Sequence, residues 1–209
     1  MKYQLCIFDF DGTLADSFPW LNRVINQVLE THQLKPLSAE EISLLRGGDG
    51  QQVIQERSVP FWKIPVIARD LRRRMRADAQ QIPTFTGAQT ILSQLSKQGI
   101  KLAIVSSNAL ENVETVLGPQ SCALIHSFEC NVPINGKGRV LERVVRRLNL
   151  LPYQAVYIGD ELRDLRAARQ VGMPFGAVSW GYNTLDALRA AQPDEVFTSF
   201  EEILARVGA

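Results

Sequence analysis

The sequence predicts an α/β fold in which a doubly wound, Rossmann-like parallel sheet carries an inserted, small all-helical cap domain. After residue 83, short apolar runs alternate with amphipathic segments, which is the pattern of parallel strands joined by helices. A first apolar run near the N-terminus is separated from this alternation by residues 17–80, where only helical patterns occur. We therefore expect residues 1–15 and 82–209 to form the core and residues 16–81 to form the cap.

The strands of the core are predicted from short apolar runs that end in polar or glycine-containing turns. Leu5–Phe8 is the first of these runs, and it is followed at once by a polar segment. The further strands are expected at Leu102–Val105, Leu124–Phe128, Ala155–Ile158, Phe175–Ser179 and Glu195–Thr198. Helices are expected at Gly87–Gln98, at Val140–Leu148 and from Asp160 to about Val171.

The cap is predicted from apolar residues at helical spacing. Leu21, Val24, Ile25, Val28 and Leu29 recur every three to four residues, and Asp16 or Ser17 is a candidate N-cap for this first helix. The remaining cap helices are expected from a capping box at Ser38 and Glu41 through Leu45, from Gln51 to Pro60, and over Pro65–Ala79.

The composition limits the classes of partner. Of the 209 residues, 45% are hydrophobic and 22% are charged, and the net charge is +1. This balance gives no electrostatic reason to expect a nucleic acid or a membrane as a partner, and no apolar run has the ~18 residues of a spanning helix. The start of the chain lacks the features of a signal peptide. Three cysteines without metal-like spacing suit a reducing compartment, so we expect a cytoplasmic protein.

Polar residues gather after the carboxyl ends of the predicted strands, where open parallel sheets bind their ligands. Carboxylates brought close together repel one another unless a cation joins them, and hard oxygen ligands in a small cluster suit Mg²⁺. A carboxylate can attack a phosphoryl group, and a second carboxyl can then exchange protons with the leaving group and with water. The residues concerned are Asp9, Asp11 and Thr13 after the first strand, Ser106 and Ser107 after the second, Lys137 before a helix, and Asp160, Glu161 and Asp164 after a later strand.

The chain resembles the haloacid dehalogenase superfamily, in the subfamily with a small helical cap, and within it the phosphoglycolate-phosphatase-like members. The matching segments are Phe8–Leu14, Val105-Ser106, Lys137 before a helix, and Gly159–Asp164. Many relatives have Lys-Pro at the third of these motifs, whereas this chain has Gly136-Lys137-Gly138. The chain therefore departs from the family pattern at the residue after Lys137, where glycine replaces the proline.

The resemblance implies a role for each motif residue. It makes Asp9 the nucleophile and Asp11 the general acid and base, with Lys137 as a third catalytic residue. It implies that Thr13, Ser106, Ser107 and Lys137 bind the phosphoryl group. It assigns Mg²⁺ to Asp9, the backbone carbonyl of Asp11, Asp160, and Asp164 or Glu161.

The implied activity is the hydrolysis of a small phosphorylated metabolite, either phosphoglycolate-like or a sugar phosphate, by a monomer or homodimer. Arg46, in a glycine-rich turn of the cap, is the cap residue expected to reach the substrate. A phosphomutase of the β-phosphoglucomutase type is the alternative. A dehalogenase would have no use for Asp11, and a phosphoryl-accepting receiver module carries its acceptor on a middle strand and has no inserted cap.

Overall fold

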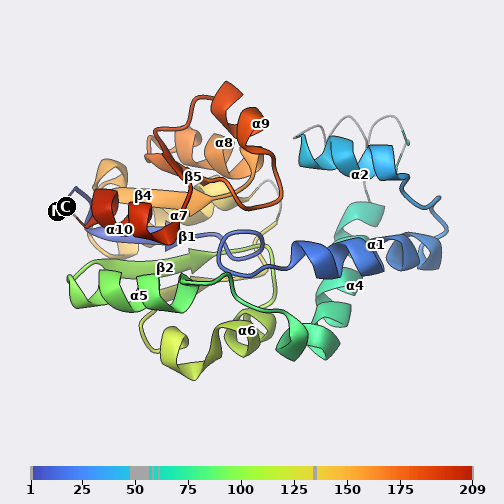
Figure 1. The fold of residues 1–209 in the computed structure, drawn as a ribbon, viewed down its shortest axis with the longest axis horizontal. Helices are drawn as coiled ribbons and strands as arrows, with labels where there is room; N and C mark the ends of the chain where they lie inside the picture. Colours follow the sequence, from blue (N-terminus) through green and yellow to red (C-terminus); the bar gives the residue numbers. More distant parts are fainter. Residues whose placement is uncertain (1, 48–56, 58, 61, 134–135, 209) are drawn as a thin grey trace.

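The computed structural model describes residues 2–47, 57, 59–60, 62–133 and 136–208. Its centre is a six-stranded sheet with the order β3-β2-β1-β4-β5-β6, in which each neighbouring pair of strands is parallel. The strands are β1 (Leu5–Phe8), β2 (Lys101–Val105), β3 (Ser127–Glu129), β4 (Ala155–Gly159), β5 (Phe175–Val178) and β6 (Glu195–Phe197). The order of the strands reverses between β1 and β4, so the switch point that binds ligands in such sheets lies beyond these two strands (Figure 1).

Two layers of helices cover the sheet because successive strand residues point to opposite faces. Cys6 and Phe8 of β1 belong to one buried cluster, which includes residues of α5, α6 and α10, whereas Leu5 and Ile7 belong to the other, which includes residues of α7, α8 and α9. The core helices are α5 (Ala88–Lys97), α6 (Leu110–Cys122), α7 (Lys137–Arg147), α8 (Leu162–Gln170), α9 (Leu185–Ala190) and α10 (Phe200–Val207), with short 3₁₀ turns η1 (Ala79–Gln81) and η2 (Pro152–Gln154).

The predicted α/β fold with a doubly wound parallel sheet is confirmed. The third strand begins at Ser127, three residues after the expected start at Leu124. Helices α6, α9 and α10 were not anticipated from the sequence pattern.

The cap region contains helices α1 (Phe18–Thr31), α2 (Ala39–Arg46) and α4 (Lys63–Asp78), which lie together at one end of the molecule (Figure 1). The expected capping box is present: Glu41 N–H donates to Ser38 Oγ at 3.2 Å, and Ser38 N–H donates to Glu41 Oε2 at 2.7 Å. Most of the helix expected from Gln51 to Pro60, and most of the glycine-rich turn before it, lie outside the described residues. The division of the chain at residues 15 and 82 stays a prediction.

The cap packs against the loop that follows β1. Trp20 and Met75 of the cap are buried in the same apolar cluster as Phe10 and Leu14 of that loop. Trp20 also donates from Nε1 to Asp78 Oδ2 at 2.8 Å, which ties the start of α1 to the end of α4. The cap thus adjoins the carboxyl end of the sheet. Within the described part of the chain, no helix is both long and apolar enough to cross a membrane.

Candidate active site

A tight loop after β1 holds Asp9 at the middle of the sheet edge. Phe10 closes this loop, because its carbonyl accepts a hydrogen bond from Leu14 N–H at 2.9 Å. Gly12 has a φ of +74°, and a Cβ at this position would lie 2.2 Å from Asp160 Oδ2. Only glycine meets both the backbone angle and the close approach. The loop after β1 is therefore packed directly on the carboxylate that follows β4.

Lys137, the first residue of α7, is buried between two carboxylates. Its Nζ lies 2.9 Å from Asp9 Oδ2 and 2.6 Å from Asp164 Oδ1, and its side chain is 2% exposed. Burial alone lowers the pKa of Lys137, but the combined attraction of Asp164 and Asp9 is stronger, so the net pKa is raised. At Asp164 burial is likewise outweighed, here by Lys137 and Arg163, and the pKa of that carboxyl is lowered. Lys137 and Asp164 therefore form a charged pair beside Asp9.

Asp160 is fully buried at the end of β4, and both of its carboxylate oxygens accept hydrogen bonds. Oδ1 accepts from Thr13 Oγ1 at 2.7 Å, and Oδ2 accepts from the backbone N–H of Tyr182 at 2.7 Å. Gly181 allows this loop to approach, since a Cβ there would lie 2.1 Å from the Asp160 Cβ. The orientation of Asp160 is thus fixed from two sides by backbone and side-chain donors.

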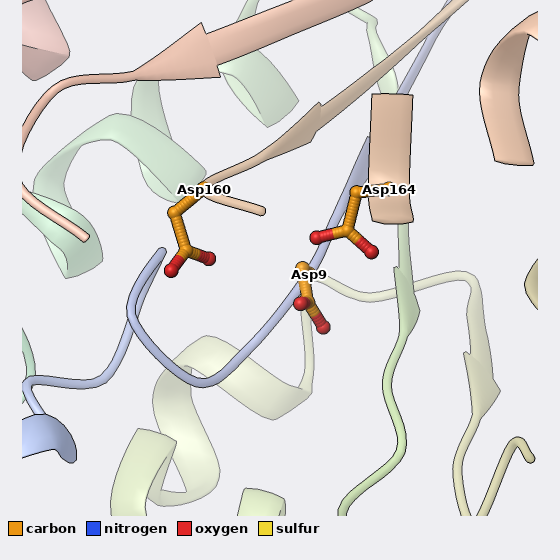
Figure 2. A group of neighbouring side chains, drawn as sticks. All are labelled: Asp9, Asp160 and Asp164. Carbon is orange, nitrogen blue, oxygen red and sulfur yellow. The ribbon is translucent and has the colours of Figure 1, made fainter. Parts of the chain in front are cut away.

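The carboxylates of Asp9, Asp160 and Asp164 form a group suited to a divalent cation. One oxygen from each lies within 4.8 Å of the others, and Figure 2 shows the three side chains around a common space. Asp164 Oδ2 is buried and has no hydrogen-bond partner among the described residues. Because a buried carboxylate oxygen without a partner is costly, this atom fits a metal-bound or water-bound state. The donor set is all oxygen, which suits Mg²⁺.

Burial also links the protonation of this group to the stability of the fold. It raises the pKa of Asp9 to about 8 against the opposing attraction of Lys137, and it raises the pKa of Asp160 well above its ordinary value. In the metal-free fold these carboxyls bind protons that the unfolded chain has already released by about pH 5. Their contribution to stability is therefore present at low pH and is lost as the pH rises toward 8.

We expect the melting temperature of the protein in EDTA to fall between about pH 5 and pH 8, and to fall less for Asp9→Asn, which cannot titrate at this position. Mg²⁺ should raise the melting temperature more at pH 8 than at pH 5, because it competes with protons for the same oxygens. Scanning fluorimetry at constant ionic strength measures both effects. A Mg²⁺-induced shift that is equal at the two pH values would contradict this linkage.

Asp11 lies apart from the three-carboxylate group, and its own carboxylate is held by two donors. Oδ1 accepts from Ser17 Oγ at 2.7 Å, and Oδ2 accepts from Asn108 Nδ2 at 2.9 Å. Tyr182 OH lies 2.9 Å from Ser17 Oγ, and since Ser17 gives its proton to Asp11, the tyrosine is the donor in that contact. Desolvation raises the pKa of Asp11, and the hydrogen bonds from Ser17 and Asn108 oppose the rise. An oriented carboxyl with a raised pKa suits proton transfer.

The hydroxyl groups predicted to contact phosphate differ in the partners that they already have. Ser106 Oγ accepts from Asn108 N–H at 3.0 Å, and none of the described residues accepts the proton of this hydroxyl. Ser107 lines the cavity described below. The Thr13 hydroxyl donates its hydrogen bond to Asp160. The phosphate contacts of these three residues stay predictions, and the free proton of Ser106 is what such a contact requires.

Arg46, at the end of α2, contacts the loop that holds Asp160. Its Nε and Nη2 donate to the carbonyls of Tyr182 and Gly181 at 3.3 and 3.5 Å, and its guanidinium lies 4.8 Å from the centre of the Phe18 ring. Asn183 Nδ2 donates in turn to the Arg46 carbonyl at 3.3 Å. The contact of Arg46 with substrate stays a prediction, whereas the contacts present join the cap to the core.

A cavity of about 640 Å³ lies between the cap and the core, with Asp11 in its wall. Helices α1 and α4 supply a largely apolar wall, and the loops after β1, β2, β3 and β5 and the start of α8 supply the opposite one. The lining residues are Asp11, Trp20, Leu21, Ile64, Pro65, Ala68, Leu71, Arg72, Met75, Ser107, Asn108, Asn131, Val132, Pro133, Arg163 and Tyr182.

Three of the residues that build the site were not assigned a role from the sequence. Asn108 directly follows the Ser106-Ser107 pair, and Arg163 stands inside the Gly159–Asp164 motif, so their positions were a usable signal. The bonds of Tyr182 to Asp160 and Ser17 depend on the path of the loop after β5, for which the sequence has no periodic signal.

The comparison with protein families agrees with this geometry. The family model described as haloacid dehalogenase-like hydrolase matches residues 6–178. A phosphoglycolate phosphatase of Synechococcus elongatus is 32% identical over 205 residues, which cover 98% of this chain and 97% of that protein. A phosphoglycolate phosphatase of Pectobacterium atrosepticum is 29% identical over 213 residues, covering 96% of this chain and 91% of the relative.

Solved structures share the fold along the whole chain. A predicted phosphatase from Clostridium acetobutylicum superposes with a TM-score of 0.82 at 18% identity, and the match covers 99% of both chains. A predicted phosphoglycolate phosphatase from Haemophilus somnus gives a TM-score of 0.76 at 22% identity, again over 99% of both chains. At these identities the likeness concerns the fold alone.

Proposed function

The chain belongs to the haloacid dehalogenase-like hydrolase family, and we propose that it is a magnesium-dependent phosphatase that transfers a phosphoryl group first to Asp9 and then to water. The observation that carries this proposal is the placement of Asp9. Its Oδ2 is 2.9 Å from the buried ammonium of Lys137, and its carboxylate shares a metal-sized space with Asp160 and Asp164. With a cation in that space and Lys137 beside it, Asp9 would be held as a carboxylate and aimed at an incoming phosphorus atom.

In the first step, an oxygen of Asp9 forms a bond to the phosphorus while the bond from phosphorus to the ester oxygen breaks. Asp11 enters this step protonated and gives its proton to the departing oxygen, which leaves as an alcohol. Lys137 holds Asp9 in place and offsets negative charge on the phosphoryl oxygens. Ser106 can donate its free hydroxyl proton to the same oxygens.

In the second step, Asp11 takes a proton from a water molecule as the water oxygen bonds to the phosphorus. The bond between phosphorus and Asp9 breaks, inorganic phosphate is released, and Asp9 returns to its carboxylate form. Asp11 is again protonated, so both residues are ready for another cycle. Ser17 and Asn108 keep the Asp11 carboxyl oriented through both steps.

Asp9, Asp160 and Asp164 would hold Mg²⁺, with the backbone carbonyl of Asp11 as a further ligand in the family pattern. Bound there, Mg²⁺ supplies positive charge that offsets the carboxylates and the phosphoryl oxygens. The substrate we propose is a phosphoglycolate-like monoester, since the two relatives above, whose matches cover 98% and 96% of the chain, are named phosphoglycolate phosphatases. The cavity volume of about 640 Å³ suits a small metabolite.

The test of this function is the release of inorganic phosphate from phosphoglycolate and from p-nitrophenyl phosphate. We expect release with Mg²⁺, its loss in EDTA, and its return when Mg²⁺ is added in excess. Free phosphate as the product separates a phosphatase from the phosphomutase alternative, which returns the phosphoryl group to a sugar. Undiminished activity after complete metal removal would contradict the proposed role of the carboxylate group.

Asp11→Asn should lower kcat/KM for phosphoglycolate by roughly 10²- to 10⁴-fold, because the alkoxide that leaves has to be protonated. The loss in kcat/KM should be smaller for p-nitrophenyl phosphate, whose leaving group is stable as an anion. The measurement is kcat/KM for both substrates with both proteins, because this ratio reports the first step, whereas the second step, in which Asp11 is the base, is common to both substrates. Equal losses in kcat/KM would show that Asp11 does not donate the proton, and Asp16→Asn in the same loop serves as the matched control.

A further inference from the structure

We propose that Arg163 and Arg72 together form a binding site for a second anionic group of the substrate, and that Arg163 is the residue that determines specificity. This inference rests on the proposed phosphatase function and adds the residues that would recognise the second anionic group of the substrate, either a carboxylate or a second phosphate. It concerns the part of the cavity that the phosphoryl-transfer machinery does not use.

The charges on the cavity wall support this site. Among the described residues that line the cavity, Arg72 and Arg163 are the cationic ones and Asp11 is the acidic one. In the proposed reaction the ester oxygen leaves beside Asp11, so the remainder of the substrate extends from there into the cavity. Most of the cap wall that it meets is apolar, including Leu21, Ile64 and Leu71. Two guanidinium groups in such surroundings favour an anionic group at the far end of the substrate.

Arg163 belongs to the core, and most of its N–H groups have no acceptor among the described residues. Its Nη2 donates to Glu161 Oε1 at 2.5 Å, and this is its only side-chain hydrogen bond to a described residue. A guanidinium has five N–H donors in a planar fork, and the side chain of Arg163 is 29% exposed. Its Nε is buried and has no partner among the described residues, so a ligand in the cavity would meet the N–H groups of Nη1 and Nη2.

Arg72 belongs to cap helix α4 and faces the same cavity. Its Nη1 donates to the backbone carbonyl of Ser107 at 3.1 Å, so its guanidinium reaches across from the cap to the loop after β2. The other arginines of this helix differ from it: Arg73 and Arg74 pair with Asp70, and neither they nor the exposed Arg69 and Arg76 line the cavity. The cavity thus has one guanidinium from the core and one from the cap.

The placement of Arg163 next to Asp164 raises a purely structural alternative, in which it only offsets the charge of the buried carboxylates. That role affects every substrate equally, because the carboxylates serve the phosphoryl group that all substrates share. A role in binding a second anionic group affects only substrates that have one. The two roles are therefore separated by comparing phosphoglycolate with 2-hydroxyethyl phosphate, which has the same chain length but no carboxylate.

The experiment measures kcat and KM for both substrates in the wild type, Arg163→Met, Arg163→Lys and Arg72→Met, with Arg76→Met as the control on the same helix. We expect Arg163→Met and Arg72→Met to lower kcat/KM for phosphoglycolate by roughly 10- to 100-fold, mainly through KM. The value for 2-hydroxyethyl phosphate should change less than about 3-fold. Arg163→Lys should recover part of the loss, and Arg76→Met should match the wild type.

Equal losses for the two substrates in Arg163→Met would overturn the inference and assign Arg163 to the carboxylate group. A wild type that hydrolyses both substrates equally well would overturn it too, while leaving the phosphatase function intact. A fructose bisphosphate paired with its monophosphate tests the second phosphate as the anionic group, and a preference for the bisphosphate that depends on Arg163 supports the site. If the wild type hydrolyses none of these esters, nor p-nitrophenyl phosphate, the proposed function itself is wrong.

Discussion

Asp9→Asn is expected to abolish the release of phosphate from every substrate, with a loss of roughly 10⁴-fold or more in kcat. The amide has no negative charge and cannot form the bond to phosphorus on which the first step depends. The substitution is nearly isosteric, and it removes a carboxyl whose burial is costly when it is ionised. The variant should therefore fold normally and melt at or above the temperature of the wild type in EDTA.

Asp16→Asn is the matched control for this variant, since it makes the same chemical change in the same loop, at a residue outside the three-carboxylate group. Its activity should equal that of the wild type. Circular dichroism and the melting temperature of both variants show whether the fold is retained. Full activity in a folded Asp9→Asn protein would exclude Asp9 as the nucleophile.

Lys137→Met is expected to lower both the stability and the activity of the protein. The ammonium group is buried with contacts of 2.9 and 2.6 Å to Asp9 and Asp164, and methionine keeps the length of the chain without the charge. Breaking a buried ion pair from one side costs about 3–5 kcal/mol of the free energy of unfolding, because the partner carboxylates lose their compensation. Loss of the charge that offsets the phosphoryl oxygens should reduce kcat by roughly 100-fold or more.

Urea unfolding in EDTA measures the first effect, and phosphate release in Mg²⁺ measures the second. Mg²⁺ should restore part of the stability, since it supplies positive charge to the same carboxylates, but it should not restore kcat. Lys97→Met, an exposed lysine at the end of α5, is the control. A Lys137→Met protein with the stability and the kcat of the wild type would place the catalytic cation elsewhere.

The sequence was informative about the sheet because buried parallel strands are short apolar runs that polar turns interrupt. Leu5–Phe8 and Ala155–Ile158 were predicted almost to the residue, and both place their carboxylates at the switch point of the sheet. The sequence likewise predicted Lys137 at the start of a helix, although the proline that follows this lysine in many relatives is replaced by glycine. The structure places it in contact with Asp9 and Asp164.

Of the three helices that were missed, α6 and α9 lack the regular pattern on which such a prediction depends, whereas α10 has it at Phe200, Ile203 and Val207. Helix α6 is interrupted by Gly118, whose φ of +74° is not helical, and by Pro119, so its apolar residues change phase within the segment. Helix α9 has only six residues, which is too few for two turns of apolar spacing. Contacts between cap and core, such as those of Arg46 and Arg72, depend on how distant segments meet and have no local signal.

The central claim is that phosphoryl transfer passes through a covalent bond to Asp9, and the stereochemistry at phosphorus tests this claim directly. A phosphorothioate monoester made chiral with oxygen isotopes is hydrolysed in isotopically labelled water, and the configuration of the released thiophosphate is determined. Two successive in-line displacements, first by Asp9 and then by water, predict net retention of configuration. Net inversion would show a single direct attack by water and would contradict the account.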